Sequence, residues 1–566
     1  MTTSPPAQAG ATVLSPAGLS HRQILTIVSG LILGVLLAAL DQTIVSTSIR
    51  TVADDLNGYS MQAWVTTAYL ITSTLSTPLY GKLSDMFGRK PFFMAAISIF
   101  IGGSLLCTFA GSMYQLAGFR AVQGIGAGGL MSLALAIMGD IVSPLERARY
   151  QGYFLAAFGT SSVLGPVIGG LLSGQHEILG VAGWRWIFLV NVPVGLFALA
   201  VVYRVLNLPR SHKPGVRVDW WGVAALAVGV TPLLVVAEQG RTWGWSDPKA
   251  LACYLIGVVG VAAFVAVEAR LGDAALIPLR LFRNSTFALG VLISVVVGAA
   301  MFGGISLVPQ YLQAVRGASP TMAGLQMLPM VLGMMVASIV SGQIISRTGR
   351  YRVFPILGAV MLTSGLFLLH YLTPDTPLWR TMVFMAVTGF GLGNLMQPLT
   401  VAIQNSAEPK DMGVSTSAAT FFRQIGGTLG VAVFLSVLFS VMPARISDEM
   451  HAAGAQPDYR HAIQAGLRSD NPADAAFSQG IVNRDPAATG KVLDDSSVLQ
   501  QLDPTLARPL KDGFADAMQT VFLSASAVAL LAFVMVLFWK EIPLRRTSGL
   551  QAAAAAQAEA EAGLKA

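Results

Sequence analysis

The chain has 566 residues, of which 54% are hydrophobic and only 11% are charged. A soluble domain carries about 25% charged residues, so this composition excludes an ordinary soluble protein and indicates a polytopic membrane protein. The net charge of +7 does not indicate nucleic-acid binding, because no basic, aromatic-rich surface segment accompanies it. The two cysteines lie in apolar runs and are interpreted as small buried residues, not as a disulfide or metal pair.

Residues 1–20 are rich in Pro, Ala, Ser and Thr and carry no charged side chain, so we expect a disordered tail. The apolar run that follows is not interpreted as a signal peptide. It has the length of a full membrane span, and it contains an acid, Asp41.

A helix needs about 20 mostly apolar residues to cross a bilayer. We expect helices because an open sheet cannot satisfy its backbone in lipid, and the apolar runs are too long for barrel strands. The predicted fold class is an all-α integral membrane protein with fourteen spans. These are residues 24–47, 61–80, 92–110, 116–139, 151–173, 185–206, 220–239, 251–268, 286–312, 321–344, 353–373, 379–403, 413–441 and 517–539.

Lys and Arg are distributed unevenly between alternate loops. If the N-terminus is inside, the inner loops and tails hold 21 of them, and the short outer loops and span edges hold 6. Because basic residues favour the cytoplasmic side, we expect both termini in the cytoplasm and the chain in an inner or plasma membrane. The long outer segment 442–516 is expected to be a polar tether or a lid, with short helices in pieces such as "ARISDEMHAAG".

Two predicted cytoplasmic loops share a spacing of glycine and arginine. "GKLSDMFGRK" (81–90) follows the second span and "GQIISRTGRY" (342–351) follows the tenth, with Ser346 where the first loop has Asp85. Internal repeats of this kind are typical of secondary transporters. The predicted organisation is an N-terminal six-helix half (21–210), two inserted helices (211–283), a C-terminal six-helix half (284–545) and an Ala-rich cytoplasmic tail (546–566).

Four stretches of the sequence carry recognisable motifs: "GKLSDMFGRKPFF", which extends the first of these loops, "LAGFRAVQGIGAGG" (116–129), "GPVIGG" (165–170) and "LDQTIVSTSI". They resemble the loop signature, the fourth-helix motif, the antiporter motif and the first-helix motif of the major facilitator superfamily. The resemblance is to its fourteen-span drug:proton antiporters of the multidrug efflux type. It implies two six-helix halves with two inserted helices. The chain departs from the pattern at Ser161, where the antiporter motif usually has Gly.

Asp41 is the acid that lies deep in a predicted span. A charge at mid-membrane costs about 2.5–3.5 kcal/mol on insertion scales, so Asp41 must face a cavity, have a partner or be protonated. Arg120 of the fourth span falls at a similar depth. Burial favours a protonated acid and a guanidinium favours the carboxylate, so the pair is interpreted as the proton-coupling site. The alternatives are a fixed ion pair or an Asp41 hydrated near the outer mouth.

The loop after the second span is interpreted as a gate. The resemblance implies that Asp85 contacts the start of span thirteen, around residues 413–417, where a helix N-terminus is partially positive. The alternative is plain positive-inside anchoring, which explains the basic residues but not the acid. The predicted gating residues are Gly81, Asp85, Gly88, Arg89 and Lys90.

The antiporter motif is expected to kink the fifth span and to let another helix approach closely. Its predicted packing residues are Gly165, Pro166, Gly169 and Gly170. The G-x-G-x-x-G pattern in "GIGAGG" follows no strand and lies in an apolar helix, so it does not predict a nucleotide site.

A substrate cavity is expected between the halves near the midplane, where Met and aromatic side chains suit varied flat ligands. If a cationic substrate binds, Asp41 is expected to be its counter-charge. Arg423 either faces the cavity or extends to the cytoplasmic surface. The candidate lining residues are Trp64, Tyr69, Gln310, Tyr311, Met327, Met330, Asn394, Gln397 and Arg423.

The predicted function is a proton-coupled antiporter that exports hydrophobic, often cationic drugs or other toxic compounds. It is expected to act as a monomer among membrane lipids, without a cofactor, a metal or nucleic acid. The alternative within transport is an exporter of one endogenous metabolite, lipid or antibiotic. A membrane receptor or enzyme is disfavoured, because the six histidines fall in predicted tails, loops or span edges and the cytoplasmic segments are short.

Overall fold

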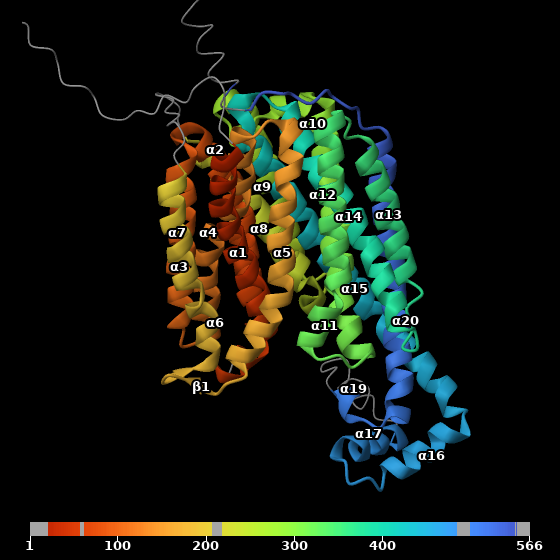
Figure 1. Ribbon diagram of the computed structural model, residues 1–566. Coiled ribbons are helices and arrows are strands. Elements are labelled where there is room, and N and C mark those ends of the chain that lie inside the picture. Colours follow the sequence, from red (N-terminus) through yellow and green to blue (C-terminus); the bar gives the residue numbers. More distant parts are fainter. Residues whose placement is uncertain (1–20, 57–60, 207–217, 484–497, 549–550, 552–566) are drawn as a thin grey trace, which may run out of the picture.

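The computed structural model describes residues 21–56, 61–206, 218–483, 498–548 and 551. Figure 1 shows that these residues form a bundle of long helices. The bundle is interrupted by one small hairpin, in which β1 (Glu177–Ile178) pairs antiparallel with β2 (Val181–Ala182). The predicted tail 1–20 and nearly all of the predicted tail 546–566 lie outside the described residues.

The first seven helices form one half of the bundle. Most of their buried apolar side chains pack among residues 24–206, so this half has a core of its own. The helices are α1 (His21–Asp55), α2 (Gln62–Phe87), α3 (Arg89–Thr108), α4 (Met113–Ile141), α5 (Pro144–Ser173), α6 (Trp186–Leu189) and α7 (Asn191–Val205).

The later helices form a second half with a separate core, which runs from residue 226 to residue 539 and takes in Ile71 of α2. Its helices are α10 (Ser285–Gln310), α11 (Pro320–Gln326), α12 (Leu328–Thr348), α13 (Val353–Leu369), α14 (Leu378–Ser406), α15 (Met412–Gly454) and α20 (Pro504–Leu537). Short 3₁₀ or π segments join or extend some of them: η2 (Gly183–Arg185), η3 (Gly272–Ala274), η4 (Leu279–Arg283), η5 (Tyr311–Val315) and η6 (Pro409–Asp411).

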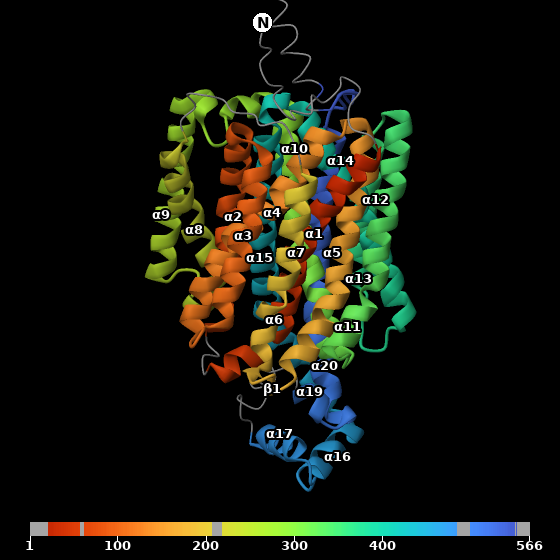
Figure 2. The ribbon, with the colours of Figure 1, turned by 60° about the vertical axis from the view of Figure 1, so that its left-hand side comes forward.

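Two helices lie between the halves in the sequence, α8 (Trp220–Trp243) and α9 (Pro248–Leu271). In space they form a pair at the edge of the bundle (Figure 2). A Cβ on Gly260 would lie 2.5 Å from the Cα of Gly229. The two glycines therefore allow a backbone approach that any side chain would prevent, as in other membrane helix pairs.

Local sequence sets where several helices begin. The Ser112 side chain accepts a hydrogen bond from the backbone of Gln115 at the start of α4, and Ser143 caps α5 with Pro144 at its first position. These residue types satisfy amide groups that an α-helix leaves without partners. Helix α12 ends at Gly349, whose φ of 71° is a left-handed conformation that favours glycine.

Twelve helices of the described chain are long and apolar enough to cross a membrane. Helix α13 is apolar but shorter. Helix α2 is 26 residues long and carries Lys82, Asp85 and several hydroxyl side chains. A helix lies at each of the fourteen predicted spans, so the predicted all-α membrane fold is confirmed.

The predicted outer segment 442–516 is largely helical. Helix α15 continues to Gly454, so "ARISDEMHAAG" is its last part and not a separate helix. Helices α16 (Pro457–Gly466), α17 (Pro472–Val482) and α19 (Val498–Gln501) join the extended ends of α15 and α20 in a projection beyond the C-terminal half (Figure 1). We call residues 442–483 and 498–516 the outer module. It is a packed helical unit, not an extended tether.

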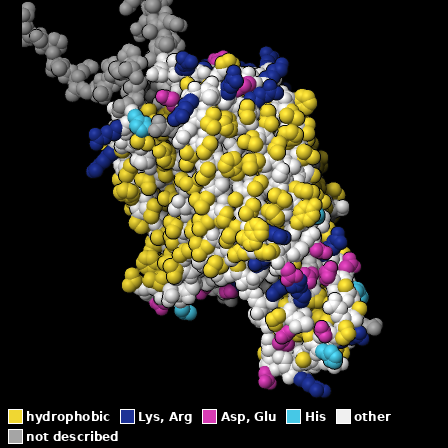
Figure 3. All heavy atoms as spheres, turned by 45° about the vertical axis from the view of Figure 1, so that its right-hand side comes forward, with side chains coloured by type: hydrophobic (Ala, Val, Ile, Leu, Met, Phe, Trp, Pro, Cys, Tyr) yellow, Lys and Arg dark blue, Asp and Glu magenta, His cyan; other side chains and the backbone are white. Residues whose placement is uncertain are grey.

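An ion pair connects the outer module to the α13–α14 loop. Arg508 Nη1 donates to Asp375 Oδ1 over 2.7 Å, and this hydrogen bonding holds the pKa of Asp375 below its usual value. Figure 3 shows hydrophobic side chains over the middle of the bundle on the face turned to the viewer, with Lys and Arg gathered at the end opposite the module. The end of α2 that carries Asp85 lies on that side of the bundle, and we call this end the Asp85 face.

Candidate functional site

Asp41 lies in a closed polar cluster in the N-terminal half. Its side chain is 0% exposed. Its Oδ2 accepts a hydrogen bond from Arg120 Nη1 over 2.6 Å, and its Oδ1 accepts from Gln123 Nε2 over 2.8 Å and from Asn191 Nδ2 over 2.7 Å. Helices α1, α4 and α7 are therefore joined through one carboxylate.

A second layer of contacts surrounds this cluster. The Arg120 guanidinium lies 4.1 Å from the centre of the Tyr69 ring, a cation–π contact with α2. The same Nη1 donates to Gln123 Oε1 over 2.7 Å, and Asn191 Nδ2 also donates to Ser104 Oγ of α3 over 3.0 Å. Five helices of one half thus contribute to the site.

The structure bears on two of the interpretations of Asp41, the hydrated acid and the ion pair. An Asp41 hydrated near the outer mouth is wrong for this state, because the carboxylate is fully buried. An Asp41–Arg120 ion pair is present. Such a buried pair is costly to break by removing one partner, by about 3–5 kcal/mol. The cluster also has spare hydrogen-bonding capacity, because Arg120 Nε and Asn191 Oδ1 have no partner among the described residues.

Sequence reasoning found the ion pair but missed the two amides that complete it. Gln123 follows Arg120 by one helical turn, and residues three apart lie on the same helix face. That spacing is a signal that was available. Asn191 lies in the stretch "LVNVPVG", and no local pattern places it beside Asp41 in space.

The structure places Asp85 against the N-terminus of α15. Asp85 Oδ1 accepts a hydrogen bond from the backbone nitrogen of Gly413 over 3.1 Å, and Oδ2 accepts from that of Val414 over 2.8 Å. Arg89 Nη2 lies 2.6 Å from Asp85 Oδ1. A helix N-terminus is partially positive and favours an anion. The carboxylate therefore joins the two halves at the Asp85 face.

Glycines allow this contact between α2 and α15. A Cβ at Gly81 would lie 2.0 Å from Ser417 Oγ, and one at Gly413 would lie 2.3 Å from Arg89 Nη1. Gly88, with a φ of 98°, connects α2 directly to α3 in a backbone conformation that other residues rarely adopt. A side chain at either contact glycine would force the helices apart.

Further polar contacts close the same face. Arg89 Nε donates to Asp140 Oδ2 over 2.6 Å. Arg147 of α5 donates to Gln404 of α14, and Gln404 Nε2 donates to Thr416 Oγ1 of α15 over 2.8 Å. The halves are therefore linked at the Asp85 face by more than one polar bridge.

The neighbouring lysines contact two other segments of the chain. Lys90 donates to the carbonyl of Tyr203 in α7 over 2.6 Å, within the N-terminal half. Lys82 donates to the carbonyl of Asp273 over 2.7 Å, and Arg280 Nε lies 2.5 Å from the Asp273 carboxylate. Lys82 thus connects α2 to the segment after α9, and Lys90 anchors the loop locally.

The antiporter motif brings α5 close to α1. A Cβ at Gly165 would lie 2.1 Å from Thr43 Oγ1, and one at Gly169 would lie 2.4 Å from Thr47 Oγ1. Thr43 Oγ1 also donates to the carbonyl of Ser161 over 3.0 Å. Ser161, where the family pattern has Gly, thus takes part in the contact through its backbone.

The other two motif residues are Gly170 and Pro166. Nothing lies within 4 Å of a Cβ built on Gly170, so that position does not need glycine for close packing. Pro166 lies inside α5 without ending it, and it is near Gly324 of α11 in the other half.

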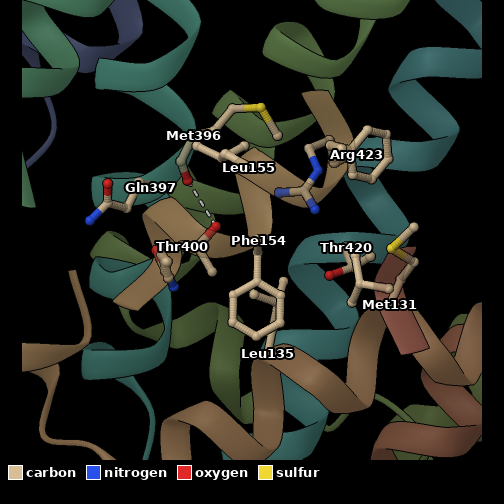
Figure 4. Close-up of a pocket in the computed structure, with 12 residues that line it drawn as sticks. Met131, Leu135, Phe154, Leu155, Met396, Gln397, Thr400, Thr420 and Arg423 are labelled. Carbon is tan, nitrogen blue, oxygen red and sulfur yellow. Dashed lines mark hydrogen bonds between the residues drawn. The ribbon is translucent and has the colours of Figure 1, made fainter. Parts of the chain in front are cut away.

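A cavity of about 110 Å³ lies between the halves (Figure 4). It is smaller than the roughly 300–1,000 Å³ of drug-sized sites, so a substrate of that size needs the halves to separate. Its walls come from α1, α4 and α5 on one side and from α14 and α15 on the other. The lining residues are Val35, Met131, Leu135, Gln151, Phe154, Leu155, Phe158, Met396, Gln397, Thr400, Thr420 and Arg423.

Of the predicted lining residues, Gln397 and Arg423 line this cavity. Arg423 therefore faces the cavity and does not extend to the surface. The residues that do not line it are Trp64, Tyr69, Gln310, Tyr311, Met327, Met330 and Asn394.

These residues lie away from this cavity because residue type does not fix which face of a helix points toward it. The Tyr311 hydroxyl donates to the carbonyl of Thr373 over 2.8 Å, and the ring is buried in the core of the C-terminal half. Asn394 donates back to the carbonyl of Phe390 in its own helix over 3.0 Å. Tyr69 instead contacts Arg120, as described above.

The chain is similar to known proteins over most of its length. The profile of the Major Facilitator Superfamily matches residues 31–431. The chain belongs to the major facilitator superfamily.

Individual relatives agree with this superfamily assignment. The chain is 34% identical over 546 residues to the uncharacterized MFS-type transporter MT1926 of Mycobacterium tuberculosis, covering 96% of this chain and 73% of the relative. It is 33% identical over 523 residues to the multidrug transporter protein MdtP of Bacillus subtilis, covering 92% and 93%. The resemblance predicted from the sequence motifs is confirmed.

A solved superfamily structure shows the same fold. The proton:xylose symporter XylE superposes with a TM-score of 0.55 at 15% identity, covering 95% of this chain and 100% of that chain. At that identity the likeness concerns the fold alone. Major facilitator proteins are transporters, and the chain has the family and the fold of one.

Proposed function

We propose that the chain is a proton-coupled antiporter that exports hydrophobic, drug-like compounds across the cell membrane. The multidrug name of the Bacillus subtilis relative supports the substrate class. The gathering of Lys and Arg at the Asp85 face (Figure 3) supports a cytoplasmic position for that face and for both termini. The protein acts as a monomer, since one chain supplies both walls of the cavity.

The observation that carries the proposal is the burial of Asp41 in a cluster on helices that also line the cavity. Helix α1 supplies Asp41 and the cavity residue Val35, and α4 supplies Arg120 and the cavity residue Met131. A proton on Asp41 removes the charge that holds Arg120. The two helices are then free to shift relative to each other, and the cavity changes shape with them.

The exchange follows from this coupling. Asp41 takes a proton from outside when the cavity is open outward, and the substrate leaves. The halves then rock, the Asp85 contacts break, and the cavity opens to the cytoplasm. Asp41 releases its proton there and pairs with Arg120 again, and a new substrate enters. Closure at the Asp85 face restores the arrangement described here.

The test is transport driven by an imposed pH gradient in proteoliposomes. Three fluorescent compounds of different charge are used: ethidium, tetracycline and 2-naphthalenesulfonate. We expect gradient-dependent accumulation of at least one compound, lost in Asp41→Asn. The matched control is Asp54→Asn, because Asp54 is an exposed acid of the same helix.

Each outcome has a defined meaning. Equal transport by Asp41→Asn and the unchanged protein would refute Asp41 as the proton carrier. Transport at the same rate with and without the pH gradient would refute proton antiport. Failure with all three compounds would contradict broad export and favour the exporter of a single endogenous compound.

A further inference from the structure

The charge in the cavity is positive. Among the described residues that line it, Arg423 is the charged one, and Asp and Glu are absent. Arg423 forms no ion pair or side-chain hydrogen bond with another described residue. Figure 4 shows its guanidinium directed toward the other lining residues. A desolvated charge without a partner is unfavourable, so this group is poised to accept an anion.

A second polar group in the cavity also has no partner. Gln151 of α5 is only 4% exposed and lines the same space. Neither its Nε2 nor its Oε1 has a hydrogen-bond partner among the described residues. A buried polar group in this condition calls for an explanation such as a ligand. Its amide N–H groups, like the guanidinium of Arg423, are unused donors.

The hydroxyl groups nearby do not compete for the anion. Thr400 donates to the carbonyl of Met396 over 2.9 Å, and Thr420 donates to that of Thr416 over 3.0 Å. Their hydrogens are engaged within their own helices. Among the described lining residues, Arg423 and Gln151 therefore keep donors without a partner, and they come from opposite halves of the bundle.

Much of the remaining lining is apolar and flexible. Phe154 and Phe158 supply flat surfaces, and Met131 and Met396 supply side chains that adapt to different shapes. Figure 4 shows Phe154, Met131 and Met396 around the same space as Arg423. Such a lining suits the hydrocarbon body of an amphiphile.

Asp41 is not placed to balance a cation in this cavity. Its oxygens accept hydrogen bonds from three side chains, it is fully buried, and it is not a lining residue. A cationic substrate would therefore meet Arg423 without a facing carboxylate. The prediction that Asp41 is the counter-charge of a cationic substrate does not fit this state.

We infer that the cavity recognises amphiphilic anions, in which an aromatic or aliphatic body carries a sulfonate, carboxylate or phosphate group. Arg423 binds the anionic group through paired N–H donors, the geometry that a guanidinium offers to such oxygens. Gln151 donates to the same group from the opposite wall. This substrate class rests on the proposed function, whereas the binding site itself does not.

The test is equilibrium binding to the purified full-length protein in a non-ionic detergent, measured by calorimetry. Three probes share one ring system: 2-naphthalenesulfonate, 2-naphthalenesulfonamide and trimethyl-2-naphthylammonium. We expect the sulfonate to bind about tenfold tighter than either of the others. A hydrogen bond to a charged group is strong enough for at least that ratio.

Variants assign the preference to the proposed residues. Arg423→Gln is expected to weaken sulfonate binding about tenfold and to leave sulfonamide binding unchanged, and Arg423→Lys is expected to keep part of the preference. Gln151→Leu provides a second test with the arginine in place. The matched control is Arg445→Gln, because Arg445 is an exposed arginine of the same helix outside the cavity.

The inference is overturned if the ammonium probe binds as tightly as the sulfonate, or if Arg423→Gln and Gln151→Leu both leave sulfonate binding unchanged. Failure of the proposed function looks different. Arginine-dependent sulfonate binding without gradient-driven transport would refute proton antiport and keep the site. Gradient-driven export of ethidium without sulfonate binding would keep antiport and refute the anion site.

Discussion

Replacing Asp85 by Asn should open the Asp85 face. The carboxylate accepts two backbone hydrogen bonds, from Gly413 and Val414, and it also pairs with Arg89. Asn keeps one oxygen acceptor but loses the charge and the second acceptor. The loss of one hydrogen bond to a charged group costs about 1.5–3 kcal/mol. The ratio of open to closed molecules should therefore rise by roughly 10- to 150-fold, at a tenfold change per 1.4 kcal/mol.

The assay is alkylation of a cysteine that is hidden only while the face is closed. Ser417 is 1% exposed and contacts α2 in this structure, so Ser417→Cys is introduced after Cys107 and Cys253 are changed to Ala. An impermeant maleimide is added to inside-out vesicles, and the labelling rate of the Asp85→Asn variant is compared with that of its parent. The control is Asp273→Asn, an exposed acid of the same face.

The expected result is labelling at least ten times faster in Asp85→Asn, with Asp273→Asn close to the parent. Equal rates in all three proteins would show that the contact with α15 does not hold the face closed. The same rise in the labelling rate of Asp273→Asn would show that the effect comes from the general loss of negative charge at this surface.

Three shorter predictions follow from the packing. Gly165→Ala should lower the melting temperature by several degrees, because the added Cβ overlaps a threonine hydroxyl. Gly170→Ala, in the same helix with open space around it, should not lower it. Equal melting temperatures of the two variants would contradict this prediction. Asn191→Ala should slow gradient-driven transport without abolishing it, because Asp41 loses one of its three donors; an unchanged rate would show that this amide is dispensable. Gly81→Ala should increase maleimide labelling of the engineered cysteine, since the added Cβ overlaps the facing serine, and unchanged labelling would oppose a tight contact.

The positions of the membrane spans were predictable because each depends on a simple local quantity, the apolar length needed to cross a bilayer. The ends of the helices were not. Helix α1 runs on to Asp55 and α15 to Gly454, well past the apolar runs. A polar residue stops a lipid-facing segment, but it does not stop the backbone hydrogen bonding of a helix.

The candidate site was predictable where charge made a partner necessary. Asp41 in an apolar run required a counter-charge at its own depth, and Arg120 was the choice that the spans allowed. The cavity was less predictable, because its lining depends on how each helix is rotated in the bundle. Phe154 and Thr420 differ in no local way from the many lipid- or core-facing residues of their helices.

The outer module has a practical consequence for imaging. Most of a 59.5 kDa membrane transporter is hidden in its detergent belt or nanodisc, where single-particle images offer little to align. The module projects beyond the bundle and is bound to the C-terminal half through α15 and α20 (Figure 1). It gives each particle an asymmetric landmark and a polar epitope for an antibody fragment. The module moves with the C-terminal half. Its tilt relative to the N-terminal half would therefore show how far the two halves have rotated in each class of particles.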